Sequence, residues 1–178
     1  PSQIVAAALL AHGKRGMLHS SLVEAATFLL DFLKAAGVRH SPALGDHPEK
    51  GFESALDGFR ADKVIARGVE EGERYYTIDE DERIKLDFYK NMTLHFFAPA
   101  SFLCAELAHE SPVARETLLT RYRAMRDKLR LEFPDVPADE QELEFEVTLA
   151  SLAAAGVIPS SATPAIAVHV DRGRRKSR

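Results

Sequence analysis

Apolar residues recur at helical spacing in three segments of the first 60 residues. Each segment predicts a helix that buries one face. The second segment follows Ser21 and Glu24, the pattern of a capping box, so we expect its helix to begin at Ser21. The apolar positions of the three segments are residues 4–11, then Leu22, Ala26, Leu29 and Leu33, then Phe52, Leu56 and Phe59.

The apolar period changes to that of strands in the next two segments. Residues 63–67 and 74–78 are separated by a turn through Gly68 and Gly72, which predicts a β-hairpin. Three helices followed by a hairpin are the order of a winged helix. We therefore expect a winged-helix-like subdomain over residues 1–78.

Residues 79–158 carry helical patterns only, which predicts a helical subdomain and makes the whole chain mostly α. Four acids at 79–82 favour a helix start, and that helix is expected to end near Phe97, with Pro99 opening a new one. Two further helices follow, within 111–133 and 138–155. The last of these is expected to bury Leu143, Val147, Ala150 and Ala154.

Composition is that of a globular protein, with 46% hydrophobic and 28% charged residues in 178. The single cysteine, Cys104, forbids an intramolecular disulfide and indicates a reducing, cytoplasmic location. The chain begins at Pro1 without methionine, which indicates a portion of something longer.

The charge is unevenly distributed. The formal net charge is −4, yet five basic residues fall in the last seven, within the segment 159–178 that we expect to be a flexible basic tail. An acidic body repels nucleic acid, whereas a basic tail can contact an anionic surface. The tail is interpreted either as a solubilising end or as a peripheral contact with the inner face of a membrane. The candidate membrane-contact residues are Arg172, Arg174, Arg175, Lys176 and Arg178.

The signatures of common catalytic sites are absent from the sequence. It contains no GxSxG, no P-loop and no GxGxxG. No two of the seven histidines are three or four residues apart, the spacing at which a helix aims two imidazoles at one metal ion. We therefore predict no catalytic residue, no metal site and no cofactor in this chain.

One stretch, residues 87–97, is unusual because large apolar side chains occupy every side of its helix. Such a helix should be enclosed by neighbours almost completely, with polar residues in or beside a core. We interpret the polar side chains of this stretch as a network that fixes helix packing. The alternative is that they contact a partner domain or an anionic ligand. Its members are Tyr89, Lys90, Asn91 and His95.

Residues 78–97 resemble the segment that follows the acyltransferase domain in the glycerol-3-phosphate acyltransferase family. There, an acid-rich helix start leads into a Tyr-Tyr-Lys-Asn motif and then a His-Phe pair; Phe88 replaces the first tyrosine here. The resemblance covers about residues 5–158. It also rests on residues 9–17, 53–56, 131–133 and 155–158.

The resemblance implies an enzyme that moves a fatty acyl group from coenzyme A or acyl carrier protein to glycerol 3-phosphate in phospholipid synthesis. In that family a His-x4-Asp motif supplies the general base. Only His19 has an acid five residues later, and that acid, Glu24, belongs to the predicted capping box. We therefore expect a non-catalytic C-terminal region whose partner is the upstream acyltransferase domain of the same parent chain.

Two other classes of function are alternatives. A winged-helix DNA-binding regulator would need basic side chains on its recognition helix, but residues 51–60 carry Glu53 and Asp57 against one arginine. No nucleic-acid partner is therefore expected. A protein-interaction module, in which the winged helix binds another chain, is the other alternative.

Overall fold

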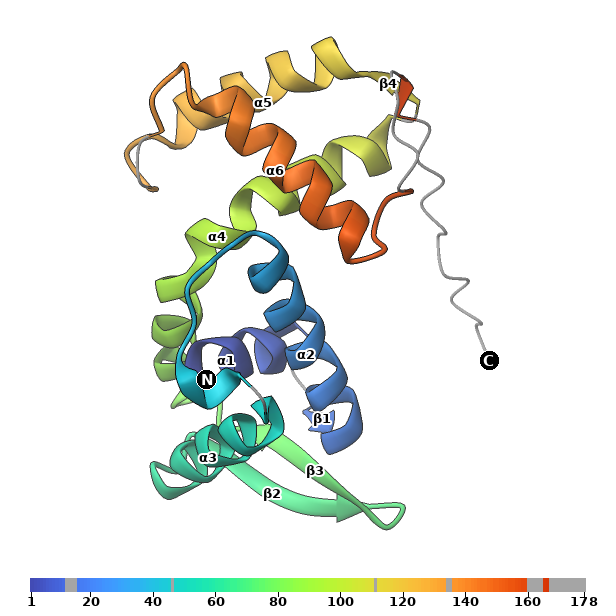
Figure 1. Cartoon of the computed structure of the whole chain (residues 1–178). Helices are drawn as coiled ribbons and strands as arrows, with labels where there is room; N and C mark the ends of the chain where they lie inside the picture. The colour runs from blue at the N-terminus through green and yellow to red at the C-terminus, as the bar shows by residue number, and fades with distance from the viewer. Residues whose placement is uncertain (12–15, 46, 111, 134–135, 160–164, 167–178) are drawn as a thin grey trace. The chain divides into compact units, whose positions relative to one another are not determined.

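The computed structural model describes residues 1–11, 16–45, 47–110, 112–133, 136–159 and 165–166. In these residues the chain is mostly helical, as the sequence predicts, with six α-helices and a small three-stranded sheet (Figure 1). It divides into two compact units, Pro1–Leu94 and His95–Arg178. None of the helices in the described ranges is long and apolar enough to cross a bilayer.

The first unit contains the three helices and the hairpin that the sequence predicts. A short strand, β1, was not predicted, and it pairs with β3 so that the antiparallel sheet has the order β1-β3-β2. The elements are α1 (Ser2–Ala11), β1 (Met17–Leu18), α2 (His19–Ala35), the 3-10 helix η1 (Pro42–Leu44), α3 (Pro48–Ala61), β2 (Ile65–Glu70) and β3 (Glu73–Ile78).

The core of the first unit is built around α1. This helix is apolar on almost every side, and Val5, Ala6 and Ala8 are completely buried where it contacts α2 and α3. From α3, Phe52 and Leu56 are buried as predicted. Burial of each such large side chain contributes about 1.5–3 kcal/mol, so the three helices are held by apolar packing.

The hairpin closes through a tight turn at Glu71 and Gly72. Both residues have positive φ, 52° and 85°, as the two central residues of a type I′ turn require. The strands pair in register from Ile65 opposite Ile78 to Glu70 opposite Glu73. Gly68 therefore lies within β2 and not in the turn, where the sequence had placed it.

The helix α4, Arg83–His109, is continuous through Pro99, so the predicted break at that proline is wrong. Proline removes one helical hydrogen bond and normally costs about 3 kcal/mol in a helix interior. Here Leu103 and Leu107 are buried on the turns that follow, and their burial offsets the loss.

The second unit consists of the end of α4 with α5 (Arg115–Leu129) and α6 (Gln141–Ala154). Tyr122 and Phe145 are fully buried between them, with ring centroids 5.5 Å apart. The Tyr122 hydroxyl donates a 2.6 Å hydrogen bond to Glu144, and burial raises the pKa of that hydroxyl, as does this bond. Strands β4 (Val113–Ala114) and β5 (Ala165–Ile166) pair beside these helices.

The buried face of α6 differs from the predicted stripe. Leu143 and Val147 are exposed, whereas Phe145, Thr148 and Leu152 are buried. The Thr148 hydroxyl donates to the carbonyl of Glu144 in the same helix, so its polar group is satisfied without water. A prediction from apolar residues alone misses a buried helix face that includes a polar residue such as Thr148.

Gly16 provides a test of how tightly β1 is held against β3. Its φ is +101°, and a Cβ at this residue would lie 2.2 Å from the carbonyl oxygen of Tyr76. We expect Gly16→Ala to lower the free energy of unfolding of the 178-residue chain by about 3 kcal/mol, because a backbone clash adds to backbone strain of about 1–3 kcal/mol. The measurement is equilibrium unfolding in urea.

The matched control is Gly37→Ala. Gly37 also has a positive φ, +71°, but nothing lies within 4 Å of the added Cβ. The Gly37→Ala variant should lower the free energy of unfolding by only about 1–2 kcal/mol, the strain of a left-handed backbone. Equal losses for the two variants would contradict the close packing of β1 on β3.

Candidate functional site

Three residues of the sequence-predicted polar group lie on the part of α4 that belongs to the first unit. Tyr89 is half-buried and packs edge-on against Phe59, with ring centroids 5.3 Å apart. Lys90 forms a 2.7 Å ion pair with Asp87 of the same helix. Asn91 is exposed. The three side chains therefore point to different surroundings, and a ligand role for them stays a prediction.

His95, the fourth member, is the first residue of the second unit. It is half-buried, and its ring lies 3.8 Å from that of Phe96. The expected enclosure of the helix on nearly every side is wrong for this structure, because Phe88 is 63% exposed and Met92 is 50% exposed. The helix is anchored through Leu86, which is fully buried, and leaves the opposite side open.

The five basic residues of the predicted membrane contact lie outside the described residues, so that contact stays a prediction. Cys104 is a free, half-buried thiol whose pKa is raised by burial. Within the described ranges, no group of three or more histidine, cysteine or acidic side chains is arranged to hold a metal ion.

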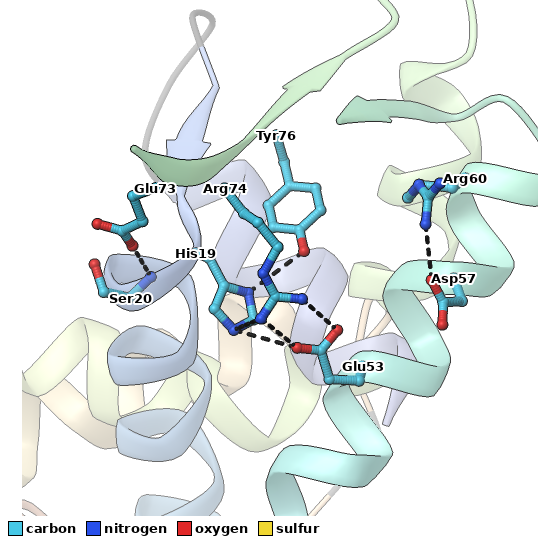
Figure 2. Close-up of polar contacts among 8 residues, drawn as sticks. All are labelled: His19, Ser20, Glu53, Asp57, Arg60, Glu73, Arg74 and Tyr76. Carbon is cyan, nitrogen blue, oxygen red and sulfur yellow. Dashed lines mark hydrogen bonds and ion pairs between the residues drawn. The ribbon is translucent and has the colours of Figure 1, made fainter. Parts of the chain in front are cut away.

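A polar cluster that the sequence did not reveal joins α2, α3 and β3 (Figure 2). Arg74 of β3 donates two hydrogen bonds to the Glu53 carboxylate, from Nη1 to Oε2 at 3.0 Å and from Nη2 to Oε1 at 2.7 Å. The same Nη2 lies 2.7 Å from Nε2 of His19, the first residue of α2. We call Glu53, Arg74, His19 and Tyr76 the Arg74 cluster.

The Arg74 cluster defines the state of the His19 ring. A guanidinium only donates hydrogen bonds, so Nε2 must be the unprotonated nitrogen that accepts. The remaining ring proton is then on Nδ1, which lies 3.4 Å from the hydroxyl oxygen of Tyr76. The 3.3 Å separation between Nε2 and Glu53 follows from the donor that they share. Both ring nitrogens are therefore engaged by protein groups.

Electrostatics in the Arg74 cluster favour the charged pair. The hydrogen bonds to Glu53 raise the pKa of Arg74 further above its ordinary value. Tyr76 is almost fully buried, and this burial raises the pKa of its hydroxyl. The tyrosine therefore keeps its proton at physiological pH and serves as a hydrogen-bonding partner in the cluster.

The first residue of the same strand, Glu73, caps α2. Its carboxylate accepts a 2.7 Å hydrogen bond from the backbone N–H of Ser20. The helix begins at His19, not at Ser21, and its N-cap residue, Leu18, makes no side-chain cap, so the predicted capping box is wrong. A carboxylate from the neighbouring strand satisfies one of the free N–H groups instead.

The hydrogen bonds from Ser20, first from its hydroxyl and then from its backbone, lower the pKa of Glu73 below its ordinary 4.5. Because the pKa of Glu73 is lower in the folded state than in the unfolded chain, the ionised carboxylate stabilises the fold at pH values above the unfolded-state pKa. This contribution is therefore complete above about pH 4.5 and is lost as the pH falls through the lower, folded-state pKa.

An open cavity of about 960 Å³ lies beside the Arg74 cluster, between α2 and α3. Its charged lining is mainly acidic, and the two cations among these residues include Arg74, which already binds Glu53. The cavity therefore does not offer a phosphate group an unpaired guanidinium. The acidic residues that line it are Glu24, Glu49, Glu53 and Asp57, and the two cations are Lys50 and Arg74.

Sequence patterns could not find the Arg74 cluster because the contacts that join its three elements link residues 21 to 57 positions apart. One signal was present in retrospect, since Arg74 and Tyr76 alternate with Tyr75 and so face the same side of the predicted strand. The residues near β3 in the sequence do not indicate that this side of the strand contacts the start of α2.

A double-mutant cycle measures how much the bidentate pair contributes. We expect Glu53→Ala and Arg74→Ala to couple by about 0.5–1 kcal/mol in urea unfolding, because two parallel hydrogen bonds fix a half-exposed ion pair. The coupling should shrink at high salt.

The matched control is the pair Asp57 and Arg60, which are joined by a single 2.9 Å contact on the exposed surface of α3. Coupling there should be about 0.2–0.5 kcal/mol. A Glu53–Arg74 coupling no larger than the control would show that the cluster does not tie the hairpin to α3.

Comparison with known proteins identifies the family. The model of the glycerol-3-phosphate acyltransferase C-terminal region matches residues 1–178. A glycerol-3-phosphate acyltransferase of Pseudomonas paraeruginosa (strain DSM 24068 / PA7) is 24% identical over 159 residues, which are 89% of this chain and 19% of the relative. One of Pseudomonas aeruginosa (strain LESB58) is 25% identical over 153 residues, 85% of this chain and 18% of the relative.

The chain spans about a fifth of the length of these curated relatives. No solved structure matches it. Because the family model covers every residue, the resemblance seen in residues 78–97 extends to the whole sequence. The chain belongs to the glycerol-3-phosphate acyltransferase family, of which it represents the C-terminal region.

Proposed function

We propose that this chain is a non-catalytic accessory region of a glycerol-3-phosphate 1-O-acyltransferase and acts as a scaffold for the upstream catalytic domain. The parent enzyme would transfer an acyl group from coenzyme A or acyl carrier protein to glycerol 3-phosphate. The observation that carries the proposal is the engagement of both His19 ring nitrogens within the Arg74 cluster.

A general base must have an unoccupied nitrogen that can accept the proton of the attacking hydroxyl. In His19 the accepting nitrogen, Nε2, is occupied by the Arg74 guanidinium at 2.7 Å. The acid in the His-x4-Asp position, Glu24, is exposed on α2, and the His19 ring is held by Arg74 and Tyr76 instead. This arrangement supports a structural role for the one histidine with a motif-like spacing.

The comparisons support an upstream partner. Relatives that share this region are about five times longer than the matched part, and the matching model is that of their C-terminal region. The catalytic motif would then lie in the parent chain before this region. A His-x4-Asp block within the preceding few hundred residues of the gene is the simplest check.

The alternative of a DNA-binding regulator is disfavoured by the surface of α3. In a winged helix this helix would enter the major groove. Its exposed side carries Glu49, Lys50 and Asp57, and Arg60 is paired with Asp57. Phosphates would meet two carboxylates, a neutralised guanidinium and a single lysine, so the charge of this surface does not favour binding.

Activity measurements test the accessory role. We expect the isolated 178-residue chain to transfer no acyl group to glycerol 3-phosphate from either donor. In the full-length parent enzyme, His19→Ala should change kcat/KM by less than about threefold, whereas loss of a general base typically costs about 10²–10⁴-fold.

The control is His19→Asn in the parent enzyme, which keeps a hydrogen-bond acceptor near Arg74 and limits any loss of folding. Melting temperatures of both variants separate a folding defect from a catalytic one. Turnover by the isolated chain that His19→Ala abolishes would overturn the proposal.

A further inference from the structure

An exposed apolar stripe runs along the first half of α4. Ile84, Phe88 and Met92 are four residues apart and therefore lie on one face of the helix. Their exposed fractions are 75%, 63% and 50%. Three large apolar side chains on consecutive turns are not expected on a helix that remains in contact with water. We call Ile84, Phe88 and Met92 the α4 stripe.

A hollow of about 350 Å³ adjoins the α4 stripe within the first unit. Ile84 and Phe88 form one wall, and Phe59, Val64 and Tyr89 contribute to the rest. The Tyr89 ring packs edge-on against both Phe59 and Phe88, with centroids 5.3 and 5.8 Å apart. The stripe therefore borders an aromatic pocket with room for an inserted apolar side chain, the arrangement that anchors many protein interfaces.

The charges beside the α4 stripe favour a protein partner over a lipid surface. Lys85 is paired with Glu82 at 2.5 Å, and Lys90 is paired with Asp87 at 2.7 Å. Arg83 is half-buried, with its Nη1 atom shielded from solvent. Helices that bind the membrane surface present unpaired lysine and arginine to anionic headgroups. Both lysines here are already paired with a carboxylate, Lys85 with Glu82 just before the helix and Lys90 with Asp87 inside it.

We infer that the α4 stripe and its hollow form the docking surface for an apolar segment in the upstream part of the parent acyltransferase chain. This inference rests on the proposed function, because it assigns a surface to the scaffold role. In the relatives, about four fifths of the length lies outside the matched region, so a parent chain of this kind would hold a large partner in the same polypeptide. The electrically balanced rim fits an apolar protein segment.

Photo-crosslinking in the full-length parent enzyme tests the inference. A benzophenone amino acid replaces Phe88, and after irradiation the product is mapped by mass spectrometry. We expect a covalent link to an upstream residue of the same polypeptide. The matched probe replaces Val69 of β2, which is 73% exposed and does not line the hollow beside the stripe; it should give no upstream link.

Ile84→Asp is expected to abolish the link from position 88, whereas Val69→Asp should leave it unchanged. Ile84 and Val69 are both β-branched and have nearly equal exposure, 75% and 73%. Because Ile84 is so exposed, Ile84→Asp should not lower the melting temperature of the isolated chain. This control separates loss of docking from loss of folding.

Three outcomes would overturn the docking surface: a link to lipid, a link between two copies of the chain, or no link at all. The readout reports proximity and does not depend on turnover. An absent link with an inactive isolated chain would therefore reject the docking surface alone. An upstream link with a catalytically active isolated chain would reject the proposed function alone.

Discussion

The Arg74 guanidinium joins three elements that are far apart in the sequence. From β3 it binds the Glu53 carboxylate of α3 with two hydrogen bonds and His19 of α2 with a third. A half-exposed ion pair contributes at most about 1 kcal/mol, so the packing of α1 against α2 and α3 supplies most of the stability. What the cluster determines is orientation. It places the hairpin against the start of α2, where Glu73 caps the helix.

The same arrangement supports the proposed accessory role of the first unit. The polar groups of the Arg74 cluster satisfy one another, so His19 has no free nitrogen with which to act on a substrate. The apolar residues of the α4 stripe, in contrast, are half or more exposed. Polar side chains that bond to one another, together with exposed apolar side chains, are typical of a domain surface that binds another protein.

Sequence patterns predicted the elements that rest on local periodicity. The first three helices and the hairpin follow from apolar spacing and turn residues near each segment. The predictions failed where contacts with residues distant in the sequence determine the local structure. Glu73 caps α2 from a strand more than 50 residues away, and burial of Leu103 and Leu107 carries α4 through Pro99. The Arg74 cluster was not predicted for the same reason, because contacts between separate elements leave no periodic signal.

The most direct test of the central claim is the protonation state of the His19 ring, measured by long-range nitrogen–proton NMR on the labelled chain at neutral pH. We expect the proton on Nδ1 and an unprotonated Nε2, because Nε2 accepts from Arg74. In the Arg74→Ala variant, the tautomer with its proton on Nδ1 should no longer be preferred. A proton on Nε2 in the unmodified chain, or a spectrum that Arg74→Ala leaves unchanged, would contradict the structural role of His19.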